Sequence, residues 1–447
     1  GKCMKHDQIL RAPKTDRRAP LALWHLDRAL HRLIRTGMLE VRLPDGETRR
    51  YGTGSSAISI AIRDWPTLRR IVTRPDLALG EAWMEGGLSV EKGDLYGLIA
   101  LCLENYQNVR LPWLWRFRDR LRMTLRRFTM YNPIPRSRRN VAHHYDLGDD
   151  LYDLFLDAER QYSCAYFETS EESLEIAQVL KMRHIAAKLR VLPGQKVLDI
   201  VSGWGGLGMY LAHVSDAQVT GVTLSVAQQK YATDRARTDG LNDRVRFDLR
   251  DYRHQTGRFD RIVSVGMVEH VGVRHYGEYF GTLANLLDTD GVALVHTIGS
   301  ARPPRAPDPW ITKYIFPGGY VPSLSEIVPE VERAGLVIAD IEVLRLHYAE
   351  TLKSWRDRFM AHWSEAAAQY DERFCRMWEF YLASCEAGFR HNFLVVFQIQ
   401  LAHRLDAVPM TRDYMESTKR QLPELSRGRN ADTVKSNARR EGRVAAE

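Results

Sequence analysis

Residues 196–206 read KVLDIVSGWGG, a short apolar run that passes directly into a glycine-rich turn. The run Lys196–Ile200 predicts a buried strand, and the apolar stretch from about Leu207 to Val214 predicts a helix after the turn. This arrangement places backbone N–H groups at a helix N-terminus, where they favour negatively charged ligand groups. The turn lacks the GxGxxG spacing of dinucleotide binders, and no Walker lysine follows it, which disfavours NAD and ATP as ligands.

Strand and helix patterns alternate beyond this turn. Further strands are predicted at residues 218–223, 244–249, 261–265, 292–298, 337–344 and 393–400. Helices are predicted at residues 225–239, with Ser225 as N-cap, and at residues 276–287 and 322–334. The alternation predicts a doubly wound α/β sheet whose ligands bind at the carboxyl ends of the strands. The order and spacing of the seven strands resemble the class I S-adenosylmethionine methyltransferase plan.

Composition and pattern divide the chain into five segments. Residues 1–20 are polar and expected to be loose, and residues 21–109 predict a small α+β domain. Residues 110–139 are a basic linker, residues 140–410 form the α/β domain, and residues 411–447 are a charged tail.

One stretch of the larger domain does not fit a simple doubly wound sheet. Residues 347–391 separate the last two predicted strands and are rich in Trp, Phe, Tyr and Met. A helical insertion of this composition suits a lid over an acyl-chain tunnel, and ordinary core packing is the alternative.

The net charge of +8 is concentrated in the linker. Residues 110–139 hold ten arginines and one acid, Asp119, a local +9, so the rest of the chain sums to 8 − 9 = −1. Five aromatic residues interleave with these arginines: Trp113, Trp115, Phe117, Phe128 and Tyr131. Arginine and tryptophan together suit an anionic membrane surface, which we expect as a partner. A solvated helix face and nucleic acid are the alternatives, and we expect no nucleic acid partner.

Composition excludes several classes of protein. With 44% hydrophobic and 27% charged residues, wholesale disorder is excluded. The longest apolar stretch, residues 95–103, is far shorter than the ~20 residues of a membrane span. Five cysteines without CxxC spacing predict neither a metal site nor a disulfide framework. No secretory signal is expected, so we expect a cytoplasmic protein associated peripherally with the inner face of the membrane.

Eight segments, in this order between residues 140 and 401, resemble the cyclopropane-fatty-acyl-phospholipid synthases. They read NVAHHYDLGDDLYDLFLD, YSCAYF, VLDIVSGWGG, VTGVTLSVAQ, FDRIVSVGMVEHVG, LVHTIG, YIFPGGYVPS and YLASCEAGFR. The stretch LALGEAWMEGGLSVEKGDL, residues 77–95, is similar to the extra N-terminal domain of the longer bacterial members. The mycolic-acid and fatty-acyl C-methylating enzymes share most of the same segments.

The resemblance implies a reaction and an assembly. The reaction is methylene transfer from S-adenosylmethionine to the cis double bond of an unsaturated phospholipid acyl chain, forming a cyclopropane ring. The assembly is a homodimer, with an N-terminal domain for lipid binding or oligomerisation.

The resemblance also implies a cofactor site along the strand tips. Its residues would be Tyr145, Gly203, Gly205, Thr223, Leu224, Gln228, Asp251 and Tyr252. Tyr145 would contact the carboxylate end of the cofactor, and the two glycines would allow close backbone approach. Thr223, Leu224 and Gln228 would hold the ribose and methionyl portion of the cofactor. Asp251 and Tyr252 would flank its adenine. Plain core packing is the alternative for Leu224 and Tyr252.

The chemistry calls for a base beside the methyl group. Attack of an alkene on the sulfonium methyl leaves a carbocation, which must lose a proton before the ring closes, while water is excluded. The family uses bound bicarbonate, whose implied ligands here are Cys164, Glu269, His296, the Ile298 backbone and Tyr348. Aromatic faces stabilise a cation, and the candidates are Trp204, Tyr162, Phe167 and Tyr314. Cys385 is assigned a pocket-lining role, because the chemistry needs no covalent enzyme intermediate.

The nucleotide loop departs from the family pattern. Members usually read Gly-Cys-Gly where this chain reads Val201-Ser202-Gly203. A β-branched residue resists the angles of a tight turn, and holding them would cost ~1–3 kcal/mol. This puts cofactor affinity in doubt. The alternatives to ring formation are acyl-chain methyl branching, small-molecule C-methylation, and a catalytically impaired lipid-binding homologue.

Overall fold

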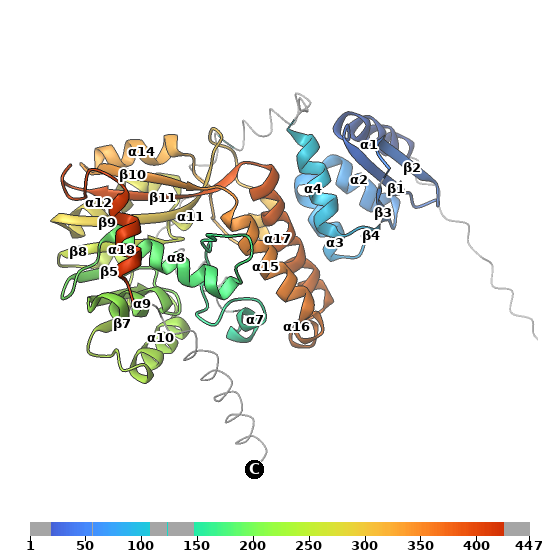
Figure 1. The fold of residues 1–447 in the computed structure, drawn as a ribbon. Coiled ribbons are helices and arrows are strands. Elements are labelled where there is room, and N and C mark those ends of the chain that lie inside the picture. The colour runs from blue at the N-terminus through green and yellow to red at the C-terminus, as the bar shows by residue number, and fades with distance from the viewer. Residues whose placement is uncertain (1–18, 56, 108–122, 124–146, 424–447) are drawn as a thin grey trace, which may run out of the picture. The chain divides into compact units, whose positions relative to one another are not determined.

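The computed structural model describes residues 19–55, 57–107, 123 and 147–423. The chain divides into two compact units, Gly1–Val109 and Arg110–Glu447, and each is described by itself (Figure 1). Nearly all of the arginine-rich 110–139 segment and the predicted cofactor residue Tyr145 lie outside the described residues.

The N-terminal unit contains a four-stranded sheet in the order β2-β1-β3-β4. Strands β1 and β3 are parallel, and the two outer pairings are antiparallel. The elements are α1 (Ala19–Leu33), β1 (Gly37–Arg42), β2 (Thr48–Thr53), β3 (Ala57–Ile62), α2 (Trp65–Thr73), α3 (Pro75–Met84), β4 (Leu88–Lys92) and α4 (Leu95–Tyr106).

The structure agrees with the small α+β domain predicted for residues 21–109. Strand β2 has little sequence signal, because its residues TRRYGT are polar and only Tyr51 is buried. Pro66 lies in the first turn of α2, which Asp64 caps by accepting from the Thr67 N–H at 2.8 Å. Proline tolerates the first turn because its missing N–H has no intrahelical partner there.

The larger unit contains a seven-stranded sheet in the order β10-β11-β9-β8-β5-β6-β7. All neighbours are parallel except β11, which runs antiparallel to both β9 and β10. The strands are β5 (Lys196–Ile200), β6 (Gln218–Thr223), β7 (Val245–Leu249), β8 (Phe259–Val265), β9 (Leu287–Ser300), β10 (Val337–Leu344) and β11 (Leu394–Ala402). The predicted doubly wound seven-stranded fold is confirmed.

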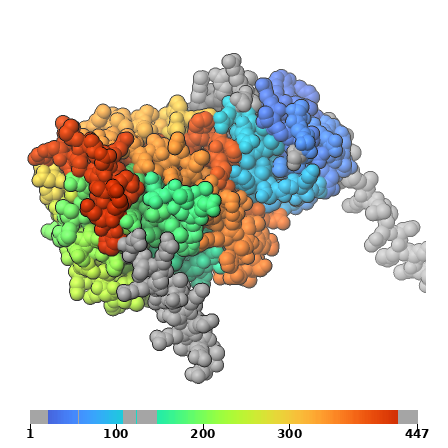
Figure 2. Space-filling view, viewed as in Figure 1, coloured from blue at the N-terminus to red at the C-terminus, as the bar shows by residue number. Residues whose placement is uncertain are grey.

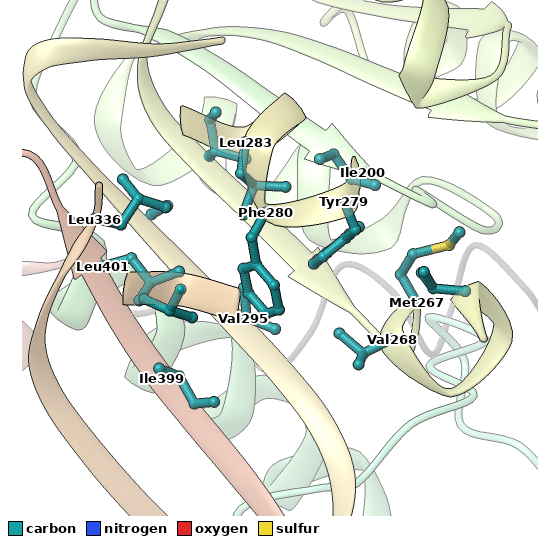
Figure 3. Packing of buried hydrophobic residues seen from close by; sticks show 14 of the residues in the cluster. Ile200, Met267, Val268, Tyr279, Phe280, Leu283, Val295, Leu336, Ile399 and Leu401 are labelled. Carbon is teal, nitrogen blue, oxygen red and sulfur yellow. The ribbon is translucent and has the colours of Figure 1, made fainter. Parts of the chain in front are cut away.

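Helices cover both faces of this sheet. One face packs against α8 (Leu174–Leu189), α9 (Gly206–Ser215) and α10 (Val226–Thr238). The other packs against α11 (Val268–Val271), α12 (Tyr276–Leu286) and α14 (Leu324–Arg333). Figure 3 shows Phe280 and Leu283 of α12 beside Val295 of β9 and Ile399 and Leu401 of β11. Burial on both faces explains why the central strands read as continuous apolar runs.

The segment between β10 and β11 is helical. It consists of α15 (His347–Ala361), α16 (Trp363–Gln369) and α17 (Glu372–His391), with α15 and α17 side by side (Figure 1). The remaining helical elements are α7 (Asp149–Asp153), η1 (Tyr252–His254), η2 (Val273–His275), α13 (Pro309–Tyr314) and α18 (Asp413–Gln421). In Figure 2, α18 (red) lies on the surface against α8 (green), where Arg183 Nε donates to the Lys419 carbonyl at 2.8 Å. Within the described ranges, every helix is too short or too polar to span a bilayer.

Candidate functional site

The glycine turn after β5 combines one crowded glycine with one open glycine. A Cβ on Gly205, which has φ of 86°, would lie 2.6 Å from the Phe247 ring and 2.8 Å from the Ala232 side chain. Gly203 has φ of 56°, and a Cβ there would meet no atom of the described structure within 4 Å. Packing therefore requires a glycine at 205, whereas at Gly203 the backbone faces open space that a ligand can approach.

Val201, the residue that departs from the family pattern, has φ of 64°. This is the left-handed region, which β-branched residues rarely enter. The side chain packs against the apolar core of the α11–α12 face. The turn thus keeps a conformation suited to glycine, and Val201 carries the conformational cost expected from its sequence.

The tip of β6 joins two of the predicted cofactor residues. Thr223 Oγ1 lies 3.1 Å from Gln228 Oε1 and accepts from the Ser225 N–H at 3.2 Å. Ser225 caps α10, as predicted, by accepting from the Gln228 N–H at 3.3 Å. The buried Gln228 Nε2 has no hydrogen-bond partner within the described part of the chain, so it remains available to a polar ligand.

The predicted adenine-flanking pair lies just beyond β7. Asp251 accepts hydrogen bonds from the Arg253 N–H and side chain at 2.8–3.0 Å. Burial alone would raise the pKa of Asp251, but these bonds outweigh it and hold the pKa below its usual value. Tyr252 belongs to the buried core and packs edge-on against Tyr279, whereas Leu224 is half-buried. Tyr252 therefore has a packing role in this structure whether or not it also contacts a ligand.

Glu269 and Ile298 are brought together at the carboxyl edge of the sheet. Glu269 lies on α11, just after β8, and its Oε1 accepts from the Ile298 N–H of β9 at 2.7 Å. Its Oε2 is buried without a hydrogen-bond partner in the described structure. Burial raises the pKa of Glu269 to about 7, although the Ile298 bond opposes the shift. The Ile298 N–H that sequence reasoning assigned to bicarbonate thus serves Glu269 here.

His296 lies two residues before Ile298 on β9, level with Val265 at the end of β8. Its Nδ1 is 3.1 Å from Nε2 of Gln398, its register partner on β11. Burial, reinforced by the charges of Lys181 and Lys188, lowers the pKa of His296 well below its usual value. The ring is therefore neutral at physiological pH.

The predicted thiols and Tyr348 lie on or beside α15 and α17. Cys164 Sγ donates to the Ala165 carbonyl at 3.2 Å, and the Ala165 N–H donates to Thr351 Oγ1 at 3.0 Å, one turn beyond Tyr348 on α15. Burial raises the pKa of the Cys164 thiol far above its usual value and that of Cys385 to about 12. Both are neutral thiols, which does not favour a nucleophilic role.

Aromatic residues connect these elements. Tyr162 OH is 2.8 Å from Tyr381 OH of α17, and the Tyr162 ring lies 5.2 Å from that of Trp355 on α15. Trp355 in turn contacts Tyr348 edge-on at 5.7 Å. Of the other aromatic candidates, Trp204 packs against Tyr152, Tyr314 packs against Trp310, and the Phe167 N–H donates to His347 Nδ1.

Sequence reasoning missed a buried charged group behind the glycine turn. Lys181 of α8 donates to Gln161 Oε1 at 2.6 Å and to Ser163 Oγ at 2.8 Å. Burial lowers the pKa of Lys181 to about 8 and raises that of Asp199 on β5 to about 7. Lysines in helices are usually solvated, so helical periodicity alone does not single out a buried one. The available signal was the spacing of Lys181, His184 and Lys188, which places all three on one helix face.

Comparison with known proteins identifies the fold and the family. The family model for mycolic acid cyclopropane synthetase matches residues 134–399. The chain belongs to this family. A second model, a domain of unknown function, matches residues 26–110. The family and the methyltransferase enzyme class predicted from sequence are thereby confirmed.

Two curated relatives and one solved structure illustrate the similarity. The chain is 40% identical over 350 residues to the cyclopropane-fatty-acyl-phospholipid synthase of Escherichia coli (strain K12), covering 77% of this chain and 88% of the relative. It is 36% identical over 378 residues to a probable fatty acid methyltransferase of Pseudomonas putida, covering 81% of this chain and 91% of the relative. The mycolic acid cyclopropane synthase CmaA1, solved with SAH and CTAB, aligns with a TM-score of 0.57 at 32% identity, covering 61% of this chain and 99% of that one.

Proposed function

We propose that this protein transfers a methylene group from S-adenosylmethionine to the cis double bond of an unsaturated phospholipid acyl chain, forming a cyclopropane ring. The observation that carries the proposal is Glu269, a buried carboxyl with a pKa of about 7 and one unpartnered oxygen within the described structure. It lies at the same edge of the sheet as the glycine turn and His296. The 40% identity to the E. coli cyclopropane-fatty-acyl-phospholipid synthase supports the substrate class.

The residues present fit S-adenosylmethionine, which when bound supplies an electrophilic methyl group. The backbone at Gly203 would accept close approach of the cofactor, because an added Cβ there meets nothing within 4 Å in the described structure. The free Gln228 Nε2 would donate to a polar group of the cofactor. Asp251, rigidly held by Arg253, would fix the loop beyond β7 near the adenine.

The residues also fit bicarbonate, which would supply the base that removes the proton. His296, neutral and with Nδ1 engaged by Gln398, would donate through Nε2 to an oxyanion. Glu269, protonated over part of the physiological range, would use Oε2 to donate to or accept from the same group. Cys164 and Tyr348 complete the proposed set, with Ile298 acting through Glu269.

The helices α15–α17 would act as the lid over the acyl chain. Tyr162 of the loop after α7 contacts both Trp355 of α15 and Tyr381 of α17, so these three residues would present aromatic faces to the acyl chain and exclude water. Cys385, one turn beyond Tyr381, would line the same region. The arginine-rich segment 110–139 would dock the protein on the inner face of an anionic membrane, and a homodimer remains part of the proposal.

Incubation with S-adenosylmethionine and unsaturated phosphatidylglycerol vesicles, followed by NMR of the extracted lipid, tests the reaction. We expect vinyl proton signals to disappear as cyclopropane methylene signals appear. A methyl-branched or methylene product would favour acyl-chain branching instead of ring formation. Cofactor binding by calorimetry without any lipid product would favour the impaired homologue.

Glu269→Gln tests the proposed anion site. The amide oxygen can still accept from the Ile298 N–H, but the group can no longer exchange a proton near pH 7. We expect turnover to fall by about a hundredfold or more, with little change in cofactor affinity. Depleting dissolved bicarbonate should slow the wild type too. Equal losses of turnover and cofactor affinity would place Glu269 in the wrong site.

A further inference from the structure

We propose that Lys188 and Gln398 are positioning residues that hold His296 in its Nε2–H tautomer, so that the ring always presents a donor to the bound anion. The proposal rests on the proposed function of His296. It comes from a chain of hydrogen bonds that runs from Glu342 on β10 through Lys188 on α8 and Gln398 on β11 to His296 on β9.

The chain begins at a carboxylate. Glu342 Oε2 is 2.6 Å from His184 Nε2 and also accepts from Lys188 Nζ. Burial would raise the pKa of Glu342, but His184 and Lys188 outweigh it and hold that pKa far below the usual value. Burial lowers the pKa of Lys188, and the adjacent Glu342 charge opposes that shift. The pair thus keeps Glu342 as an acceptor and Lys188 as an ammonium group, which has three donors and no acceptor.

The ammonium group decides which way the amide of Gln398 points. Lys188 Nζ is 2.8 Å from Gln398 Oε1, and only the oxygen of an amide can accept from a donor. The NH₂ end must therefore face the other way, toward His296 Nδ1 at 3.1 Å. Reversing the amide would set two donors against each other at Lys188, which makes the orientation unambiguous.

The amide in turn decides the tautomer of His296. Because Gln398 Nε2 donates, His296 Nδ1 must use its lone pair, and a neutral ring then carries its single proton on Nε2. The ionisable groups whose charges act on the ring are Lys181, Lys188, His184 and Glu342. The first three disfavour a second proton and only Glu342 favours it, so the neutral form persists across the physiological range.

The neighbouring residue Gln400 provides a matched control. It follows Gln398 by two positions on β11, points to the same side of the sheet, and is equally buried. Its Nε2 donates to the Lys188 carbonyl and to Tyr414 OH, both at 2.7 Å. Replacing either glutamine with glutamate buries a carboxylate in the same strand, but only Gln398→Glu alters the partner of His296.

Two-bond ¹H–¹⁵N NMR of the full chain labelled with ¹⁵N-histidine tests the proposal directly. The His296 signal is assigned by its absence in His296→Gln. In the wild type we expect a neutral Nε2–H ring from pH 6 to 8. In Gln398→Glu the new carboxylate should accept from Nδ1–H and reverse the tautomer, whereas Gln400→Glu should leave the His296 pattern unchanged.

Turnover supplies the second readout. Gln398→Glu should lower kcat by about a hundredfold or more with an unchanged KM for S-adenosylmethionine, and Gln400→Glu should retain kcat at temperatures where it is folded. An Nδ1–H or protonated His296 in the wild type would overturn the proposal even if no variant folds. A tautomer reversal without loss of kcat would overturn it as well. Because the NMR needs no turnover, an inactive wild type with the expected tautomer would instead count against the proposed function.

Discussion

Asp199 and Asp251 are aspartates buried near the carboxyl ends of β5 and β7, yet their surroundings shift their pKa values in opposite directions. Burial raises the pKa of Asp199 to about 7, and its Oδ2 has no hydrogen-bond partner among the described residues. Burial would also raise the pKa of Asp251, but the hydrogen bonds and charge of Arg253 outweigh this effect and hold the pKa below its usual value. Neither environment is visible in sequence, where Asp199 lies within a short apolar run and Asp251 follows a strand.

The two aspartates predict opposite dependences of stability on pH. The favourable contribution of protonated Asp199 is present below its unfolded pKa of ~3.9 and is lost as pH rises through about 7. Asp199→Asn should therefore gain stability relative to the wild type as pH rises from about 4 to about 7. The ionised Asp251 carboxylate stabilises the fold above its unfolded pKa. Asp251→Asn should therefore lower the free energy of unfolding most near pH 7 and least in acid. Urea unfolding of both variants across pH checks this, and slopes of the same sign would contradict it.

Val201 predicts an unusual order of stability between two small replacements. Alanine and glycine both remove its apolar packing, but alanine keeps a Cβ at φ of 64°. The left-handed conformation costs a residue with a Cβ roughly 1–2 kcal/mol. Val201→Gly should therefore be more stable than Val201→Ala by about 1 kcal/mol, the reverse of the usual order, and it should bind S-adenosylmethionine at least as tightly as the wild type. Thermal unfolding and calorimetry measure the two effects.

At the scale of elements, hydrophobic periodicity correctly located the strands and helices whose positions are set by burial of apolar side chains. The bounds of β5, β6 and β10 match the predicted ranges, and Ser225 caps α10 as expected. Strand β9 extends well beyond the predicted 292–298, because its first residues pair with β8 through an irregular register that no local pattern reveals. The polar network behind the site was missed for a related reason: Lys188 and Gln398 become buried partners only when α8 crosses the sheet.

Helices α15 and α17, the proposed lid, carry one buried and one exposed carboxylate whose removal should have different effects on stability. Glu386 of α17 is buried and accepts from Arg356 Nε of α15 at 2.9 Å and from Arg390 Nε at 3.3 Å. Glu386→Ala leaves two partly buried arginines without this acceptor, which should cost about 3 kcal/mol. Asp357 of α15 pairs with Lys353 at the surface, so Asp357→Ala should cost less than about 1 kcal/mol.

Protease sensitivity distinguishes a lid effect from general destabilisation. If Glu386 holds α15 and α17 together, Glu386→Ala should expose cleavage sites within residues 347–391 before the rest of the chain unfolds. Similar unfolding temperatures for the Glu386 and Asp357 variants would show that the buried ion pair adds nothing to the packing of the two helices.

At the scale of the whole molecule, several residues of the family segments lie at one edge of the sheet because those segments fall at strand ends. Gly203, Thr223 and Glu269 each follow or end a parallel strand, and parallel strands share one carboxyl edge. The sequence could not show that the Ile298 N–H is taken by Glu269, nor that Tyr381 meets Tyr162. Those contacts join residues 29 and 219 positions apart, and they depend on how α11 and α17 pack.

The proposed reaction requires the protein to reach acyl chains inside a bilayer, and the charge distribution of the whole chain predicts which segment docks on the membrane. The 110–139 segment carries a local +9 in a chain of net charge +8, together with five aromatic residues. Near an anionic surface each basic residue contributes about 1 kcal/mol. Replacing Arg116, Arg118, Arg120 and Arg122 with glutamine should therefore weaken vesicle binding by roughly two to three orders of magnitude at low salt.

Cofactor binding should survive the same four substitutions, because the Gly203 turn lies in a separate stretch of the chain. Sedimentation with anionic vesicles across salt concentrations measures the first effect, and calorimetry with S-adenosylmethionine measures the second. Wild-type binding should weaken as salt rises, since counterions screen the arginines. If vesicle binding changes neither with salt nor with the four substitutions, the segment is a solvated or interdomain surface and not the membrane-docking site. Preference for DNA over vesicles would favour nucleic acid as the partner, since the same arginines also pair with its phosphates.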